Sequence, residues 1–134
     1  MLAVTLCRVP ETSYPHFVDG DFKTVNLDAK GNHEQAISDY TKAIELYPKD
    51  AEAYNNRGYA YFGKGDFDRA ISDCTKAIEI NPNLAEAYDS RAEVYYSTKE
   101  YAKAWDDEHK AESLGLKLNP DFLNKLKAVS GREK

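Results

Sequence analysis

The stretch that decides the fold is QAISDYTKAIELYPKDAEAY, which runs from Gln35 to Tyr54. It returns 34 residues later as RAISDCTKAIEINPNLAEAY, from Arg69 to Tyr88, with most positions identical. A fixed period of this length indicates a repeat architecture, in which each unit buries its apolar side against the next unit. The period therefore predicts the overall architecture before any single residue is interpreted.

Each copy of the repeat is predicted to fold as two helices. From Ala51 to Phe62 the apolar side chains follow helical spacing. The turn Gly63-Lys64-Gly65-Asp66 then interrupts this pattern, because glycine adopts positive φ without strain. The second helix carries its apolar residues on one stripe, and we expect it to end at Asn81-Pro82, where proline stops the hydrogen-bond ladder.

The unit from Ala51 to Leu84 resembles a tetratricopeptide repeat. The residues that carry the resemblance, in order along the unit, are Tyr54, Gly58, Tyr61, Ala70, Ala77 and Pro82. The resemblance implies an all-α fold, a right-handed superhelical array of antiparallel helical hairpins. It also implies a protein that binds other proteins rather than an enzyme, so we expect no catalytic residue, no cofactor and no metal site.

The period divides the chain into five parts that we expect to form one domain. An irregular or extended segment, 1–16, precedes a degenerate first repeat, 17–50, in which only the second helix, 33–47, is clear. Two repeats follow at 51–84 and 85–118. Residues 119–131 are predicted to form a capping helix, because Asn119-Pro120 is a helix start and the last repeat would otherwise expose its stacking side.

The incomplete first repeat raises the question of what covers the apolar stripe on its second helix. The side chains concerned include Ile37, Tyr40 and Ile44. Burial stabilises side chains of this kind by about 1.5–3 kcal/mol each, so we expect something to cover them. One candidate is the chain's own N-terminal segment, and the other is a second copy in a homodimer or domain swap. In the second case the three residues form a self-association surface.

Composition excludes several other classes of function. The net charge of -5 argues against nucleic acid as a partner, because phosphate binding needs a surplus of Lys and Arg. No apolar run is long enough to span a membrane, and the N-terminus is a poor signal peptide, so we expect a cytoplasmic protein. In the run from Trp105 to His109, we interpret the tryptophan as core and the acidic residues as a solvated face.

Stacked hairpins curve, and their first helices line the concave groove. The resemblance implies that a partner binds in this groove. Exposed aromatic side chains and carboxylates in that groove favour a basic or polar protein segment with an apolar anchor. The residues predicted to line it are Glu52, Asn55, Asn56, Tyr59, Phe62, Glu86, Asp89, Ser90, Glu93 and Tyr96.

Some proteins of the resembled family bind the C-terminal tail of heat-shock chaperones through a carboxylate clamp of Lys, Asn and Arg side chains. The matching places here hold Asp21, Val25, Asn56, Glu86 and Ser90. Only Asn56 fits the clamp, and carboxylates stand where two of its cations belong. Because like charges repel, we expect the chain not to bind a chaperone C-terminal tail.

Overall fold

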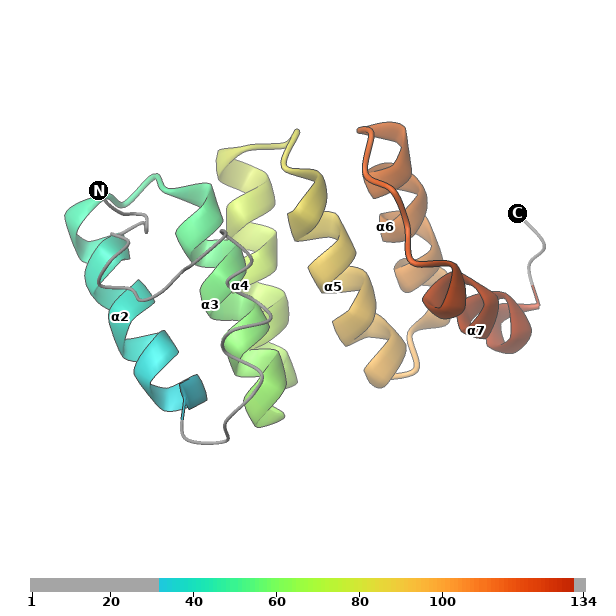
Figure 1. The fold of residues 1–134 in the computed structure, drawn as a ribbon, viewed down its shortest axis with the longest axis horizontal. Coiled ribbons are helices and arrows are strands. Elements are labelled where there is room, and N and C mark those ends of the chain that lie inside the picture. The colour runs from blue at the N-terminus through green and yellow to red at the C-terminus, as the bar shows by residue number, and fades with distance from the viewer. Residues whose placement is uncertain (1–31, 132–134) are drawn as a thin grey trace.

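The computed structural model describes residues 32–131, and within this range the chain forms six helices and no strand (Figure 1). The helices are α2 (Asn32–Leu46), α3 (Ala51–Lys64), α4 (Phe67–Ile80), α5 (Ala85–Ser97), α6 (Tyr101–Ser113) and α7 (Pro120–Ser130). The predicted all-α array of helical hairpins is therefore confirmed. Segment 1–16 and the part of the first repeat before residue 32 lie outside the described residues.

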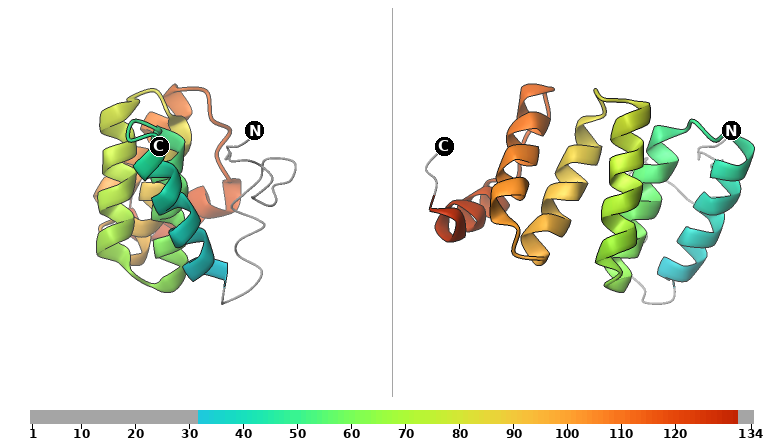
Figure 2. Two further views of the ribbon diagram at one scale, coloured as in Figure 1. Left: turned by 90° about the vertical axis from the view of Figure 1, so that its left-hand side faces the viewer. Right: turned by 180° about the vertical axis from the view of Figure 1, so that it is seen from behind.

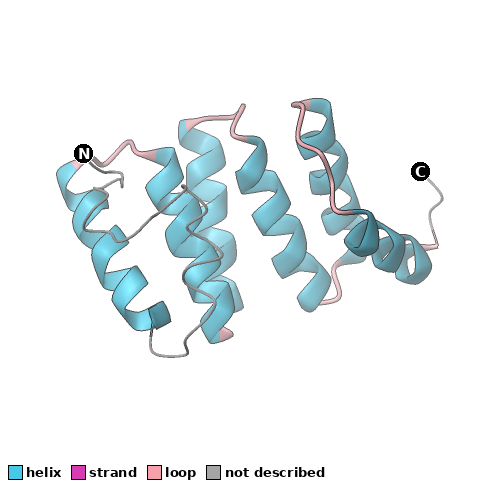
Figure 3. Cartoon of the chain, viewed as in Figure 1, coloured by secondary structure: helices cyan, strands magenta, loops and turns pink. Residues whose placement is uncertain are grey.

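Neighbouring helices pack against each other in chain order, and short loops join them (Figure 3). The closest associations are within the hairpins α3–α4 and α5–α6, and α4 joins one hairpin to the next by packing on α5. α3 also contacts α5 directly, so the first helices of the two hairpins lie side by side. Figure 2 shows the same row of helices from the side and from behind.

Side-chain and glycine caps fix the helix ends where the sequence predicts them. The carboxylates of Asp50 and Asp66 begin α3 and α4 by accepting hydrogen bonds from backbone N–H groups of the first turn. Asn119 caps α7 in the same way. Gly65 ends α3 and Gly131 ends α7, each in the left-handed conformation that glycine tolerates.

Small side chains at the helix contacts allow the two helices of a hairpin to approach closely. A Cβ atom built on Gly58 would lie 2.9 Å from Cys74 Sγ and 3.0 Å from the carbonyl oxygen of Ala70. Cys74, Ala70 and Ala77 are fully buried, so Cys74 serves as a small core residue. At the other end of the row, Trp105 and Leu126 form a cluster that joins α7 to α6.

The apolar stripe on α2 lies within the core of the chain. Tyr40 and Ile44 are buried, and they cluster with Ala53 and Ala60 of α3. Ile37 packs against the same cluster and is half-buried. Two of the three residues expected on a self-association surface are therefore not exposed, because α3 packs over that side of α2.

The prediction of a solvated acidic face beyond Trp105 was wrong for two of its residues. Asp106 is exposed, but Asp107 and Glu108 are buried, and Glu108 has no exposed surface. Helix periodicity explains the difference, since Glu108 lies one turn after the buried Ala104 on the side of α6 that faces α5.

Candidate functional site

The two first helices, α3 and α5, carry the residues that the sequence predicts for partner binding. Of the ten predicted residues, Asn55 and Ser90 are buried, so their side chains do not belong to an exposed surface. The other eight are half-buried or exposed. We call these eight the α3/α5 face: Glu52, Asn56, Tyr59, Phe62, Glu86, Asp89, Glu93 and Tyr96.

Aromatic rings occupy the C-terminal halves of both helices. On α3, the ring of Phe62 lies 5.8 Å from that of Tyr59 in an edge-to-face arrangement, and 5.8 Å from that of Phe67. On α5, Tyr96 packs on Phe122 of the capping helix at 5.3 Å. The ring of Tyr96 is therefore partly covered by the capping helix α7. Tyr59 and Phe62 form an aromatic pair within α3.

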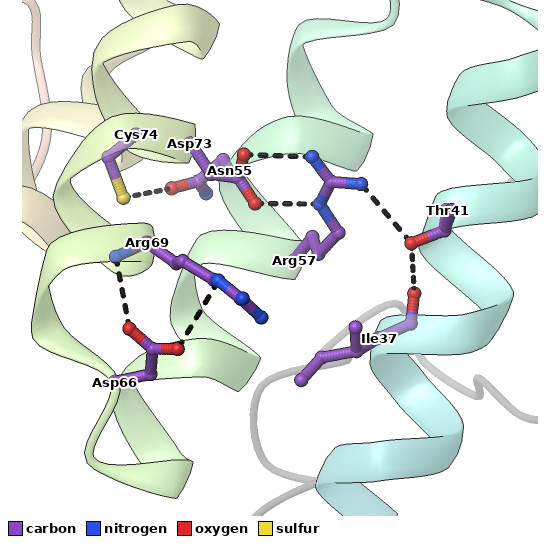
Figure 4. Close-up of polar contacts among 8 residues, drawn as sticks. All are labelled: Ile37, Thr41, Asn55, Arg57, Asp66, Arg69, Asp73 and Cys74. Carbon is purple, nitrogen blue, oxygen red and sulfur yellow. Dashed lines mark hydrogen bonds and ion pairs between the residues drawn. The ribbon is translucent and has the colours of Figure 1, made fainter.

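An arginine bridge that occurs in both hairpins holds the first helices in place, and Figure 4 shows its first copy. Arg57 on α3 donates two hydrogen bonds to Asp73 on α4, at 2.7 and 2.9 Å, and a third to Thr41 Oγ1 on α2, at 3.2 Å. One side chain thus ties together three helices. The hydrogen bonds to Asp73 hold the pKa of Arg57 above its ordinary value, so the guanidinium stays charged.

The same bridge occurs one repeat later. Arg91 on α5 donates to Asp107 on α6 at 2.7 and 2.8 Å, and to Thr75 on α4 at 3.1 Å. Hydrogen bonds to Asp107 raise the pKa of Arg91 as well. Each arginine also lies over tyrosine rings of its own helix, within 6 Å of their centres. The two bridges give α3 and α5 equivalent positions in their hairpins.

The two hairpins differ at one buried place behind these helices. In the first, Cys74 Sγ lies 3.8 Å from Asn55 Oδ1 (Figure 4). In the second, 34 residues on, the corresponding residues are Glu108 and Asp89. An uncharged buried pair in one hairpin is thus a pair of carboxyl groups in the next.

Glu108 is the most perturbed acid among the described residues. Loss of solvent around its buried side chain is the largest cause of the shift. Together with the neighbouring carboxyl groups of Asp89, Glu93 and Asp107, it raises the pKa of Glu108 to about 8. At neutral pH Glu108 therefore carries a proton, which it can donate to Asp89. We call Asp89, Glu93 and Glu108 the carboxyl cluster.

Two family models match the chain, both of tetratricopeptide repeats. One covers residues 51–84 and the other covers residues 29–65. Together with the hairpins and the 34-residue period, these matches decide the family. The chain belongs to the tetratricopeptide repeat family. No curated protein sequence matches it.

Solved structures of other tetratricopeptide repeat (TPR) domains have the same fold. The first TPR domain of human RPAP3 is 28% identical, with a TM-score of 0.68 over 76% of this chain and 80% of that one. The first TPR of Spaghetti, bound to an HSP90 peptide, is 27% identical, with a TM-score of 0.68 over 85% and 94%. The TPR2B domain of yeast Sti1, in complex with an Hsp70 peptide, is 29% identical, with a TM-score of 0.67 over 83% and 94%.

Sequence reasoning missed both the arginine bridges and the carboxyl cluster of this TPR array. A signal for the bridges was present, because Arg57, Asp73 and Thr41 each recur 34 residues later as Arg91, Asp107 and Thr75. Three polar residues repeating in step indicate a shared polar contact. For the cluster, the signal was that Glu108 takes the apolar place of Cys74, but the burial of its carboxyl group required the structure.

No group of three or more metal-ligating side chains is arranged to hold an ion within residues 32–131. In that same part of the chain, no helix has both the length and the apolar character needed to cross a membrane. His33 is buried with its ring against Gly63. The α3/α5 face, together with Glu108 of the carboxyl cluster, is thus the candidate functional site.

Proposed function

We propose that the chain is a non-catalytic protein-interaction module that binds a basic protein segment on its α3/α5 face. The observation that carries the proposal is the combination of aromatic rings and carboxylates on two adjacent helices. Tyr59 and Phe62 offer a half-buried anchor surface, and the exposed Glu52 and Glu86 bring negative charge to the same helices. Aromatic contacts supply much of the energy in peptide interfaces, and the carboxylates select a cationic partner.

The similar structures support a peptide as the kind of partner. Spaghetti and yeast Sti1 are each described with a chaperone peptide bound to a TPR domain of this fold. The chemistry of the face differs from that of a clamp for such a tail. Glu86 is exposed where the clamp has a lysine, and Ser90 is buried where it has an arginine. We therefore propose that the bound segment is basic rather than the acidic tail of a chaperone.

A peptide library tests the proposal directly. Fluorescence anisotropy of labelled octapeptides should select sequences with Lys or Arg next to an aliphatic or aromatic residue. Binding of the selected peptides should weaken as salt rises from 50 to 500 mM, because exposed charges are screened within about 10 Å at 0.1 M. Selection of acidic peptides, or of no peptide at all, would contradict the proposal.

Variants of the face identify where those peptides bind. Tyr59→Ala with Phe62→Ala should weaken binding at least tenfold, the usual effect of removing central aromatic contacts. Tyr47→Ala is the matched control, because Tyr47 is an exposed ring outside the face. Reversing charge with Glu86→Lys should also weaken binding, whereas Glu112→Lys, on the exposed side of α6, should not. Circular dichroism confirms that each variant is folded.

The chaperone tail provides a negative test. A labelled peptide ending in Glu-Glu-Val-Asp should show no micromolar binding, because the carboxylates of the face repel it. If the peptide binds, the single change Glu86→Lys should leave its affinity the same or raise it. Micromolar binding to the parent chain would show that the charge argument is wrong.

A further inference from the structure

Glu108 is a buried acid without a hydrogen-bond donor. Its side chain has no exposed surface, and neither carboxyl oxygen accepts a hydrogen bond from any described group. The group that it meets is Asp89, whose carboxylate can pair with it only while one of the two acids holds a proton. A buried carboxyl in this state destabilises the fold.

The packing of the hairpin α5–α6 does not require an acidic side chain at position 108. The arginine bridge of the same hairpin uses Asp107 and is complete without Glu108. The equivalent place in the preceding hairpin holds Cys74 beside Asn55, an uncharged pair in a hairpin with the same arginine bridge. Because the bridge forms without the acid, the presence of Glu108 points to a role in binding.

We propose that the carboxyl cluster receives the cationic side chain, lysine or arginine, of the bound segment. The inference rests on the proposed function and adds to it the point at which the partner's positive charge is recognised. Asp89 and Glu93 lie one turn apart on α5 and are half-buried, so their side chains reach the surface. Glu108 lies behind them on α6 and supplies a third carboxyl group to the same site.

The arriving cation changes the protonation state of the site. Before binding, the O–H group of Glu108 is intact and donates to Asp89. The charged groups acting on Glu108 are Asp89 and Glu93 from α5 and Asp107 from α6 itself, and all three are acidic. A cation among them offsets that repulsion, so the O–H bond of Glu108 breaks and its proton leaves to solvent. Both electrons of the bond stay on the carboxylate, which then attracts the cation.

A side-chain cation fits the site better than a metal ion does. The three acids are not arranged as a metal-binding group within the described chain. A guanidinium or ammonium donates several hydrogen bonds over a wider span, and carboxylates accept them readily. The cluster shares Asp89 and Glu93 with the α3/α5 face, so a segment bound on that face can place one side chain against the cluster.

A small probe tests the site without any knowledge of the natural partner. N-acetyl-arginine amide is added to the intact chain at constant ionic strength, and backbone and carboxyl resonances are followed by NMR. We expect saturable shifts centred on Asp89, Glu93 and Glu108, together with a fall in the pKa of Glu108. N-acetyl-citrulline amide, an uncharged analogue of the same shape, should produce neither change. An equal response to both compounds, or no response to either, would overturn the proposal.

Two variants complete the test. Glu108→Gln keeps the shape of the side chain but not its charge, and should weaken binding of the arginine probe about tenfold. Glu112→Gln removes an exposed carboxylate of α6 that lies outside both the α3/α5 face and the cluster, and it should leave the probe's affinity within twofold. Unchanged binding by Glu108→Gln would show that Glu108 takes no part.

The arginine probe and the peptide library test different claims, so one can fail while the other succeeds. If no octapeptide binds but the arginine probe shifts the cluster, the cation site stands and the α3/α5 face fails as a peptide surface. If peptides bind and the probe does not, the face stands and the cation site is refuted.

Discussion

The hairpins α3–α4 and α5–α6 share the same arrangement of helices and the same arginine bridge, but they differ in their helix caps and contact residues. Both contain the same arginine bridge, with corresponding distances that agree within 0.1 Å. The first hairpin has side-chain caps at Asp50 and Asp66, whereas Leu84 and Glu100 make no such bond in the second. The arginine bridge and the small contact residues are therefore common to both hairpins, whereas side-chain caps are present in only one of them.

The largest expected effect comes from breaking the shared arginine bridge. Arg57→Gln and Arg91→Gln each leave a nearly buried aspartate without its cation, so each should lower the free energy of unfolding by about 3–5 kcal/mol. Urea denaturation measures both. Lys64→Gln is the control, because its ion pair with Glu34 is exposed and should contribute less than about 1 kcal/mol. A large loss in only one hairpin would show that the bridges are not equivalent.

The second prediction uses the buried acid that distinguishes the hairpins. Glu108 has an ordinary pKa of 4.5 and a folded pKa of about 8, so the folded chain binds a proton more tightly than the unfolded chain does. Stability therefore falls as pH rises between these values, by roughly 1.4 kcal/mol per pH unit. Glu108→Gln removes this loss, so its advantage over the parent should grow from near zero at pH 4.5 to roughly 4 kcal/mol at pH 8.

Urea denaturation at several pH values measures that advantage, and Glu112→Gln on the exposed side of α6 is the matched control. The difference between parent and Glu108→Gln cancels the contribution of acids that titrate equally in both. A difference that does not change with pH would mean that Glu108 is ionised in the folded chain.

The sequence predicted the fold of this chain better than it predicted the site. The 34-residue period located the two hairpins, and Asn119-Pro120 with Gly131 located the helix that covers them. These signals are local, because caps, breakers and helical spacing act within a few residues. The fold could therefore be read from the order and size of the side chains.

The polar interior could not be predicted in the same way, because it depends on which helix faces which. Asp106 and Glu108 are both acidic and two residues apart, yet one is exposed and the other is fully buried. Asn55 and Ser90 lie on helices expected to line the groove, but packing buries their side chains. Position along a helix gives the direction of a side chain, while its solvent exposure is decided by the neighbouring helices.

A smaller effect is expected from exchanging the contact residues of the two hairpins. Gly58→Ala should lower stability by about 1–2 kcal/mol, because its Cβ would lie 3.0 Å from a backbone oxygen of Ala70 that cannot move alone. Ala92→Gly should also lower stability, by about 1 kcal/mol, through the poor helix propensity of glycine. Thermal unfolding of both variants tests whether each residue suits only its own hairpin. A stable Gly58→Ala variant would show that α4 can shift away.

The smallest expected effect is at the turn inside each hairpin. Gly65 has a φ of +84°, and the equivalent Lys99 has a φ of +65°, which is unfavourable for a residue with a side chain. Lys99→Gly should therefore raise the free energy of unfolding by about 0.5–1 kcal/mol, and Gly65→Lys should lower it by about 1 kcal/mol. No atom lies within 4 Å of a Cβ built on Gly65, so the second change tests the backbone alone. Urea denaturation of the two variants should give shifts of opposite sign. If both variants lose stability, the strain of a positive φ does not explain the difference between the two turns. The contacts of the Lys99 side chain would then stabilise the fold by more than its backbone strain destabilises it.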